Sequence, residues 1–184
     1  MVLISDILQV RRKRGEKMEE VDWSDRAFYD DGKWVTWSEI DEQLRYKEWG
    51  AKYPNAKRSI IPYFEELISL AESYHHETGL HLSVYGDIGE LFGAITYGIE
   101  LNKTYAQGSD GRLGNDHVEI KTITPFKTKD VVVVDTTRHF SKLLVVKINE
   151  EFEIAGRMID RKLLPKRTGR FLRIRWDDLP PAHR

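Results

Sequence analysis

The sequence contains no cysteine, and this absence removes two classes of site. Neither a disulfide framework nor a thiolate zinc site can form, so a bound metal must be held by oxygen or imidazole ligands. Long apolar runs are also missing. The first residues, "MVLISDILQVRRKRGEK", place a short apolar stretch before a basic run, which fits neither a signal peptide nor a membrane span. We therefore expect a cytoplasmic protein with no membrane partner.

An excess of charge of one sign is lacking as well, because the net charge is only −1. This balance argues against a protein that coats nucleic acid through bulk positive charge. The charges are unevenly distributed, however: acids dominate residues 19–42, whereas residues 161–175 are basic and contain no acid. Such asymmetry lets one face meet phosphates, and a solvated basic strand and loop is the alternative interpretation.

The length of 184 residues suits one principal domain with an appendage. Residues 1–55 are rich in tryptophan and acids and predict a small N-terminal subdomain, with a hairpin around Gly32 and a helix starting near Ser38. Pro54 and Asn55 interrupt the pattern. We therefore predict a second, larger domain over residues 56–184.

Two helices are predicted at the start of this second domain. The first begins at Ser59, carries apolar residues at helical spacing and ends at Gly79. The second lies in "YGDIGELFGAITYGIEL" and contains Glu90 beside its apolar stripe. Four glycines lower the intrinsic stability of this helix, so we expect another element to pack close to it. These glycines are Gly86, Gly89, Gly93 and Gly98.

Short runs of β character follow, rich in valine, isoleucine and aromatic residues and separated by turn residues. They predict a sheet of about five or six strands after the two helices. The runs are 107–113, 117–123, 131–135, 142–148, 152–159 and 171–176. The segment "DTTRHFSK" is predicted to be a loop between strands, for which contact with a substrate is one interpretation.

A candidate site lies in the stretch "GSDGRLGNDHVEIKT". Side chains alternate along a strand, so Val118 and Ile120 face one side and Glu119 and Lys121 the other. A hairpin turn at "LGND" would bring Asp110 near Glu119. Two neighbouring carboxylates repel unless a cation lies between them, and Mg²⁺ accepts such oxygen ligands. We expect Asp110 and Glu119 to hold the metal and Lys121 to orient a water that attacks phosphate.

The pattern of an acid, any residue and lysine is weak evidence by itself, because it occurs three times: Asp31 to Lys33, Glu119 to Lys121 and Asp160 to Lys162. The first match spans Gly32 in a predicted turn, and the last reads as a polar strand end, which leaves it a minor alternative. Only the middle match combines an alternating strand, an upstream acid beyond a turn and a preceding helix with Glu90.

At these residues the sequence resembles the PD-(D/E)XK nuclease superfamily, through Glu90 in "GDIGELFGAI", Asp110 in "GSDGRL", and Glu119 with Lys121 in "HVEIKT". The resemblance implies an α/β fold with a restriction-endonuclease-like core, in which helices flank a central mixed sheet and the elements run helix, three strands, helix, strand. It further implies a Mg²⁺-dependent endonuclease acting on DNA, with Glu90 as an additional metal ligand and Mn²⁺ as a substitute ion. Ser109 stands where the family name would put proline. Asp116 remains an alternative to Asp110 as the first ligand.

Given such a site, we expect the arginines of the basic segment to contact the DNA backbone. They are Arg167, Arg170, Arg173 and Arg175. RNA remains open as a substrate, and a homodimer would let a single-site nuclease cut both strands, an expectation from symmetry. The alternative function is a non-catalytic nucleic-acid-binding or regulatory protein that keeps the nuclease fold. A glycosidase fits less well, because the acid pair is accompanied by a lysine and a basic strand.

Overall fold

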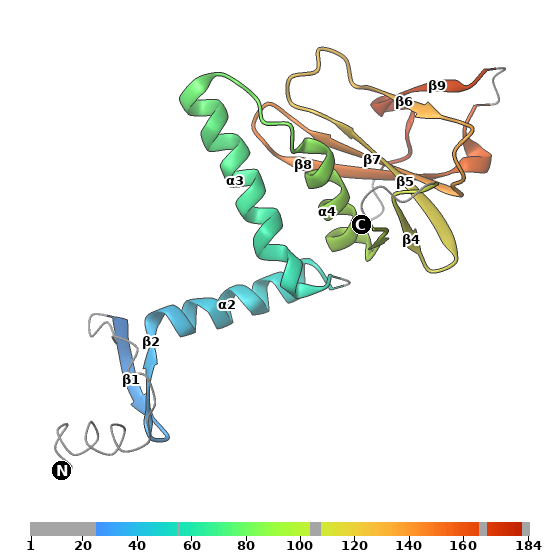
Figure 1. Ribbon diagram of the computed structural model, residues 1–184. Coiled ribbons are helices and arrows are strands. Elements are labelled where there is room, and N and C mark those ends of the chain that lie inside the picture. The colour runs from blue at the N-terminus through green and yellow to red at the C-terminus, as the bar shows by residue number, and fades with distance from the viewer. Residues whose placement is uncertain (1–24, 55, 104–107, 166–168, 182–184) are drawn as a thin grey trace, which may run out of the picture. The chain divides into compact units, whose positions relative to one another are not determined.

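The computed structural model describes residues 25–54, 56–103, 108–165 and 169–181 (Figure 1). Its contacts divide the chain into two compact units, one up to Lys47 and one from Glu48 onward. The structure is of mixed α/β type. Among the described residues, no helix has the length and apolar character needed to cross a membrane.

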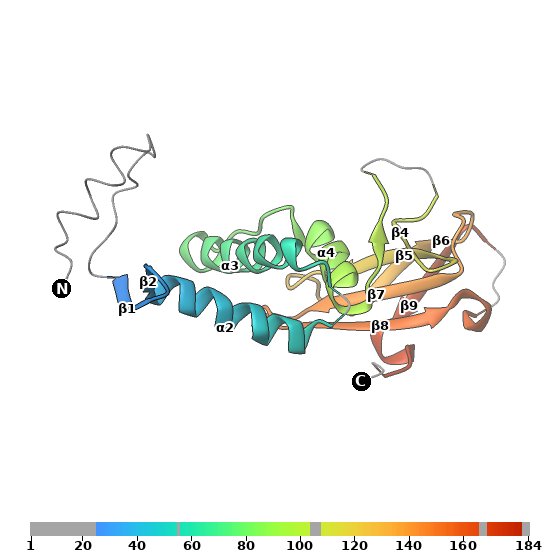
Figure 2. The ribbon, with the colours of Figure 1, turned by 90° about the horizontal axis from the view of Figure 1, so that it is seen from below.

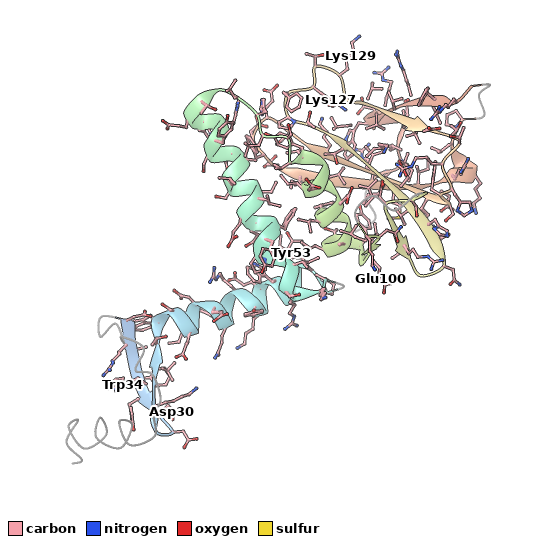
Figure 3. All side chains as sticks on the ribbon, viewed as in Figure 1. Asp30, Trp34, Tyr53, Glu100, Lys127 and Lys129 are labelled. Carbon is pink, nitrogen blue, oxygen red and sulfur yellow. The ribbon has the colours of Figure 1, made fainter. Side chains whose placement is uncertain are left out.

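The first unit contains the predicted hairpin, formed by antiparallel strands β1 (Arg26–Asp30) and β2 (Lys33–Thr36). Asp31 and Gly32 both have positive φ, as a tight two-residue hairpin turn requires. Figure 3 labels Asp30 and Trp34 on the two strands. Helix α2 (Trp37–Lys52) follows at once and crosses the boundary between the units. Thr36 and Glu39 exchange side-chain to backbone hydrogen bonds of 2.9 and 3.1 Å, a capping box that starts α2.

The second unit contains the two predicted helices, α3 (Ile61–Thr78) and α4 (Tyr85–Tyr97). Both end at a glycine in the left-handed region, Gly79 for α3 and Gly98 for α4. The predicted close packing is confirmed at Gly89, where an added Cβ would lie 2.0 Å from the Thr122 hydroxyl oxygen of a strand. The prediction of close packing is wrong at Gly86, where an added Cβ would have no neighbouring atom within 4 Å.

The predicted strands form two sheets rather than one. The larger has five strands in the order β3-β4-β5-β7-β8, with β5 and β7 parallel and the other neighbours antiparallel. The runs at 131–135 and 171–176 leave this sheet and pair with each other as β6 and β9. The strands are β3 (Glu100–Leu101), β4 (Gly111–Leu113), β5 (Asp116–Ile123), β6 (Val131–Asp135), β7 (Lys142–Ile148), β8 (Ile154–Asp160) and β9 (Phe171–Arg175).

The second unit has three layers, which the views of Figures 1 and 2 display. Helix α4 contacts β5 and β7, and α3 packs against α4. On this side of the sheet, Ile120 and Leu144 lie in one apolar core with the helices. On the other side, Ile123 and Leu143 lie in a second core with β6 and β9.

The expectation that helices flank the central sheet is therefore confirmed for one face, and β6 and β9 cover the other. The described segment between β5 and β7 contains the predicted strand β6 and no helix, whereas the resemblance implied a helix at this place. The sequence did not show that β6 lies outside the central sheet, because β7 is apolar on both faces and its apolar residues can be covered by a helix or by a sheet with the same pattern.

Candidate active site at the end of the β4–β5 hairpin

The β4–β5 hairpin brings Asp110 next to Glu119. Gly111 pairs with Val118 in the ladder, and the Asp110 amide still donates to the Val118 carbonyl over 3.0 Å. Asp110 lies just before the first residue of β4, and its carboxylate accepts a hydrogen bond of 2.7 Å from the backbone N–H of Ile120. The Asp110 side chain thus takes the hydrogen bond that a backbone carbonyl of a neighbouring strand would otherwise accept from β5. Its other oxygen faces Arg138.

Glu119 is the centre of the cluster. Its side chain is 0% exposed, although buried carboxylates are rare in proteins. The Lys121 ammonium nitrogen lies 2.6 Å from its Oε1 atom, as the alternation of β5 predicted, and shares that oxygen with an arginine. The Oε2 atom is buried and has no hydrogen-bond partner among the described residues. Burial raises the pKa of Glu119 and the charge of Asp110 adds to this, although Lys121 acts in the opposite direction.

The arginine is Arg138, which the sequence reasoning did not select as a site residue. Its Nη1 atom lies 2.5 Å from Glu119 Oε1, its Nη2 atom lies 3.4 Å from Asp110 Oδ1, and its Nε donates to the Gly108 carbonyl over 2.8 Å. Arg138 comes from the loop between β6 and β7, far along the chain. The sequence placed Arg138 in the loop "DTTRHFSK", for which substrate contact was one interpretation, and two carboxylates need a counter-ion, but neither signal says which cation supplies it.

Glu90 lies on α4, half-buried. Burial raises the pKa of its carboxyl group, and the charges of Asp110 and Asp87 raise it further, while Lys121 opposes them. Glu90 therefore senses the electrostatic field of the cluster. However, within the described ranges no three histidine, aspartate or glutamate side chains lie close enough together to hold a metal ion. Glu90 is thus not placed in one ligand shell with Asp110 and Glu119.

The competing acids lie elsewhere. Asp116 accepts a hydrogen bond of 2.8 Å from the Ser141 hydroxyl group and lies 3.5 Å from the Lys142 ammonium group. Lys142 also contacts Asp160 over 2.6 Å, and Lys162 lies 3.4 Å from the same carboxylate. The match from Asp31 to Lys33 begins in the turn of the β1–β2 hairpin. Of the two candidates for a first ligand, only Asp110 touches the cluster around Glu119.

The basic segment is partly ordered as a strand. On β9, Arg173 and Arg175 are exposed and alternate with buried Leu172 and Ile174. Arg170 pairs with Asp135 over 2.8 Å and lowers the pKa of that carboxyl group well below its ordinary value. Arg167 lies outside the described residues.

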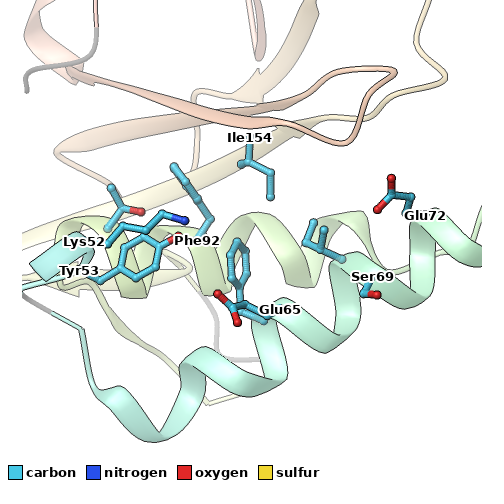
Figure 4. A pocket seen from close by; sticks show the side chains of 10 residues that line it. Lys52, Tyr53, Glu65, Ser69, Glu72, Phe92 and Ile154 are labelled. Carbon is cyan, nitrogen blue, oxygen red and sulfur yellow. The ribbon is translucent and has the colours of Figure 1, made fainter. Parts of the chain in front are cut away.

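A pocket of about 420 Å³ lies away from this cluster (Figure 4). Side chains of α3 and α4 form most of its wall, together with Lys52, Tyr53 and Ile154. Its lining contains neither Asp110 nor Glu119 nor Lys121. The charged cluster is therefore separate from this pocket.

No known family model matches the chain, and no curated protein matches it either.

Proposed function

We propose that Asp110, Glu119 and Lys121 form the active site of a Mg²⁺-dependent endonuclease that hydrolyses phosphodiester bonds in DNA, on a restriction-endonuclease-like core. The observation that carries the proposal is the buried Glu119, which has one oxygen on Lys121 and the other without a hydrogen-bond partner among the described residues. A carboxylate oxygen buried in this way costs free energy unless a cation or donor reaches it. Natural proteins accept such a cost mainly at functional sites.

The residues present fit a magnesium ion. Mg²⁺ in proteins keeps several waters and binds one or two carboxylates, so Asp110 and Glu119 are sufficient ligands. Glu90 would add negative charge from α4, consistent with the effect of Asp110 on its pKa. When bound, the metal would lower the pKa of a water molecule and offset the charge of the phosphate.

The side chains of the chain perform the remaining tasks. Lys121 is only partly exposed and is held by Glu119, so its ammonium group is fixed at the place where it would orient the attacking water. Lysine suits this task because it is a compact donor with three protons. Arg173 and Arg175 on the exposed face of β9 would contact the phosphate backbone of the bound DNA.

The order of elements supports the core assignment in part. Helix α4 carries Glu90, β4 and β5 form the hairpin that carries Asp110, Glu119 and Lys121, and β7 pairs in parallel with β5. The departure is the crossover between β5 and β7, which contains β6 in place of a helix.

The test is incubation of purified protein with plasmid and linear DNA, and with RNA, in the presence and absence of Mg²⁺ or Mn²⁺. We expect DNA cleavage that requires the metal and that falls at least about a hundredfold in Lys121→Ala. Lys162→Ala is the matched control, because Lys162 lies at the same spacing from an acid but on the surface beside Asp160. Full activity of Lys121→Ala would refute the site assignment.

A second candidate is the non-catalytic nucleic-acid-binding protein that keeps this fold. Arg138 favours it, because its guanidinium group already supplies positive charge between the two carboxylates. This candidate predicts that nucleic acid is bound without cleavage at any metal concentration, and that binding survives Glu119→Gln.

A further inference from the structure

Arg138 occupies the space between Asp110 and Glu119. One of its terminal nitrogens contacts Glu119 Oε1 at 2.5 Å and the other lies 3.4 Å from Asp110 Oδ1, so the planar guanidinium group spans both carboxylates. The third nitrogen donates to the Gly108 carbonyl at 2.8 Å, just before Asp110. All three guanidinium nitrogens of Arg138 therefore contact the two proposed metal ligands or the residue two positions before Asp110.

The loop that carries Arg138 is built to hold this position. Arg161 donates to three of its carbonyls: Nη1 to Arg138 at 2.8 Å and to Phe140 at 3.2 Å, and Nη2 to Thr136 at 2.6 Å. Asp135 accepts hydrogen bonds from the backbone and the hydroxyl group of Thr137 at 2.9 and 2.6 Å. The backbone on both sides of Arg138 is thus fixed, and only its side chain is free to change contacts.

A divalent cation that bridges Asp110 Oδ1 and Glu119 Oε1 would stand where the guanidinium group stands, because Arg138 contacts these two atoms. Lys121 also lies on Glu119 Oε1, so a further cation beside Lys121 and Arg138 would be strongly repelled in this partly buried site. We propose that Arg138 and a divalent metal ion exclude each other between Asp110 and Glu119. Arg138 keeps the metal-free site assembled and leaves it when the metal binds. This inference rests on the proposed function, because it requires that the two carboxylates bind a metal.

Lys142 offers a matched control for the proposed exclusion of the metal by Arg138. Lys142 is also a partly buried cation between two carboxylates, at 2.6 Å from Asp160 and 3.5 Å from Asp116. It lies on β7, beside β5, and touches neither Asp110 nor Glu119. Replacing Lys142 removes one charge from the same sheet without opening the proposed site.

The first measurement is Mg²⁺ affinity by calorimetry, without DNA. We expect Arg138→Gln to bind Mg²⁺ at least about tenfold more tightly than the wild type, because no competing ion pair has to break. Lys142→Gln is expected to change the affinity by less than about twofold. Equal affinity of the wild type and Arg138→Gln overturns the inference and leaves the proposed metal site standing. Absence of binding to both proteins overturns the metal site and the inference together.

The second measurement needs no variant and therefore does not depend on folding of Arg138→Gln. Phenylglyoxal modifies accessible guanidinium groups, and mass spectrometry reports the extent of modification at each arginine. We expect saturating Mg²⁺ to increase the modification rate at Arg138 several-fold while Arg161, held by three carbonyls, stays unchanged. An Arg138 rate that Mg²⁺ leaves unchanged or lowers would show that the guanidinium group stays in place, and would refute the exclusion.

Discussion

Two cations of this fold each lie between two carboxylates, and the surroundings of these carboxylates differ. Lys142 lies between Asp116 and Asp160 at the surface, where the Asp160 side chain is 33% exposed. Arg138 lies between Asp110 and Glu119, and the Glu119 side chain is 0% exposed. In the surface cluster, the hydrogen bond from Lys142 lowers the pKa of Asp160. In the buried cluster, the pKa of Glu119 is raised although two cations touch it.

The difference shows which effect is larger in each place. At the surface, attraction between opposite charges outweighs the small cost of desolvation, which is the ordinary situation of a structural ion pair. Around Glu119, desolvation outweighs the attraction, so ionising this carboxyl group costs free energy in the folded state. A side chain that the fold holds at a cost is more informative about function than an ion pair that stabilises it. Substitutions at Asp110, Glu119, Asp160 and Glu90 would test this contrast.

The largest effect is expected at Asp110. Asp110→Ala removes the acceptor of the Ile120 N–H and a partner of Arg138, and should lower the metal-free free energy of unfolding by about 2 kcal/mol. Asp110→Asn keeps a carbonyl oxygen that accepts from the Ile120 N–H, so its free energy of unfolding should fall much less. The control is Asp116→Ala, which should cost less than about 1 kcal/mol because its partners are partly solvated. Urea unfolding with a chelator measures all three, and equal losses at the two aspartates would remove the contrast.

Opposite signs are expected at Glu119 and Asp160. Because the pKa of Glu119 is raised in the folded state, this state holds more protons than the unfolded chain above the ordinary pKa of glutamate. The stability of the wild type therefore falls as pH rises through that window and stays lower above it. Glu119→Gln keeps a neutral side chain at every pH, so at pH 8 it should be more stable than the wild type.

Asp160→Asn should act in the other direction. The pKa of Asp160 is lowered, so its contribution to stability is present above the ordinary pKa of aspartate and disappears as pH falls through the folded value. At pH 8 the asparagine variant should be less stable than the wild type. Thermal unfolding of both variants from pH 4 to pH 8 measures the contrast, and loss of stability in Glu119→Gln at pH 8 would contradict it.

The smallest effect is expected at Glu90. The pKa of Glu90 is raised, as is that of Glu119, so Glu90→Gln should stabilise the metal-free protein slightly at pH 8 and by less near pH 5. The control is Asp87→Asn, since Asp87 lies exposed in the first turn of α4, where a negative charge favours the helix. That variant should be slightly less stable. If thermal unfolding showed that both variants stabilise the protein, or that both destabilise it, Glu90 would not share the electrostatic environment of Glu119.

The sequence by itself determined the local features of this protein. The period of apolar residues located α3 and α4, and the glycines after them marked where each helix ends. The alternation of β5 and the short turn before it were enough to bring Asp110, Glu119 and Lys121 together. These features follow from the backbone geometry of a few neighbouring residues, which the order of side chains reports directly.

Only the tertiary structure decided which distant segments cover the sheet and which cation enters the site. Strands β6 and β9 have the same alternation whether they extend the central sheet or pack across it, because the pattern records burial and not the covering element. Arg138 reaches Glu119 because β7 runs parallel to β5, which places the loop before β7 beside the start of β5. Long-range pairing of this kind depends on the free energy of the whole core, and no short stretch of sequence encodes it.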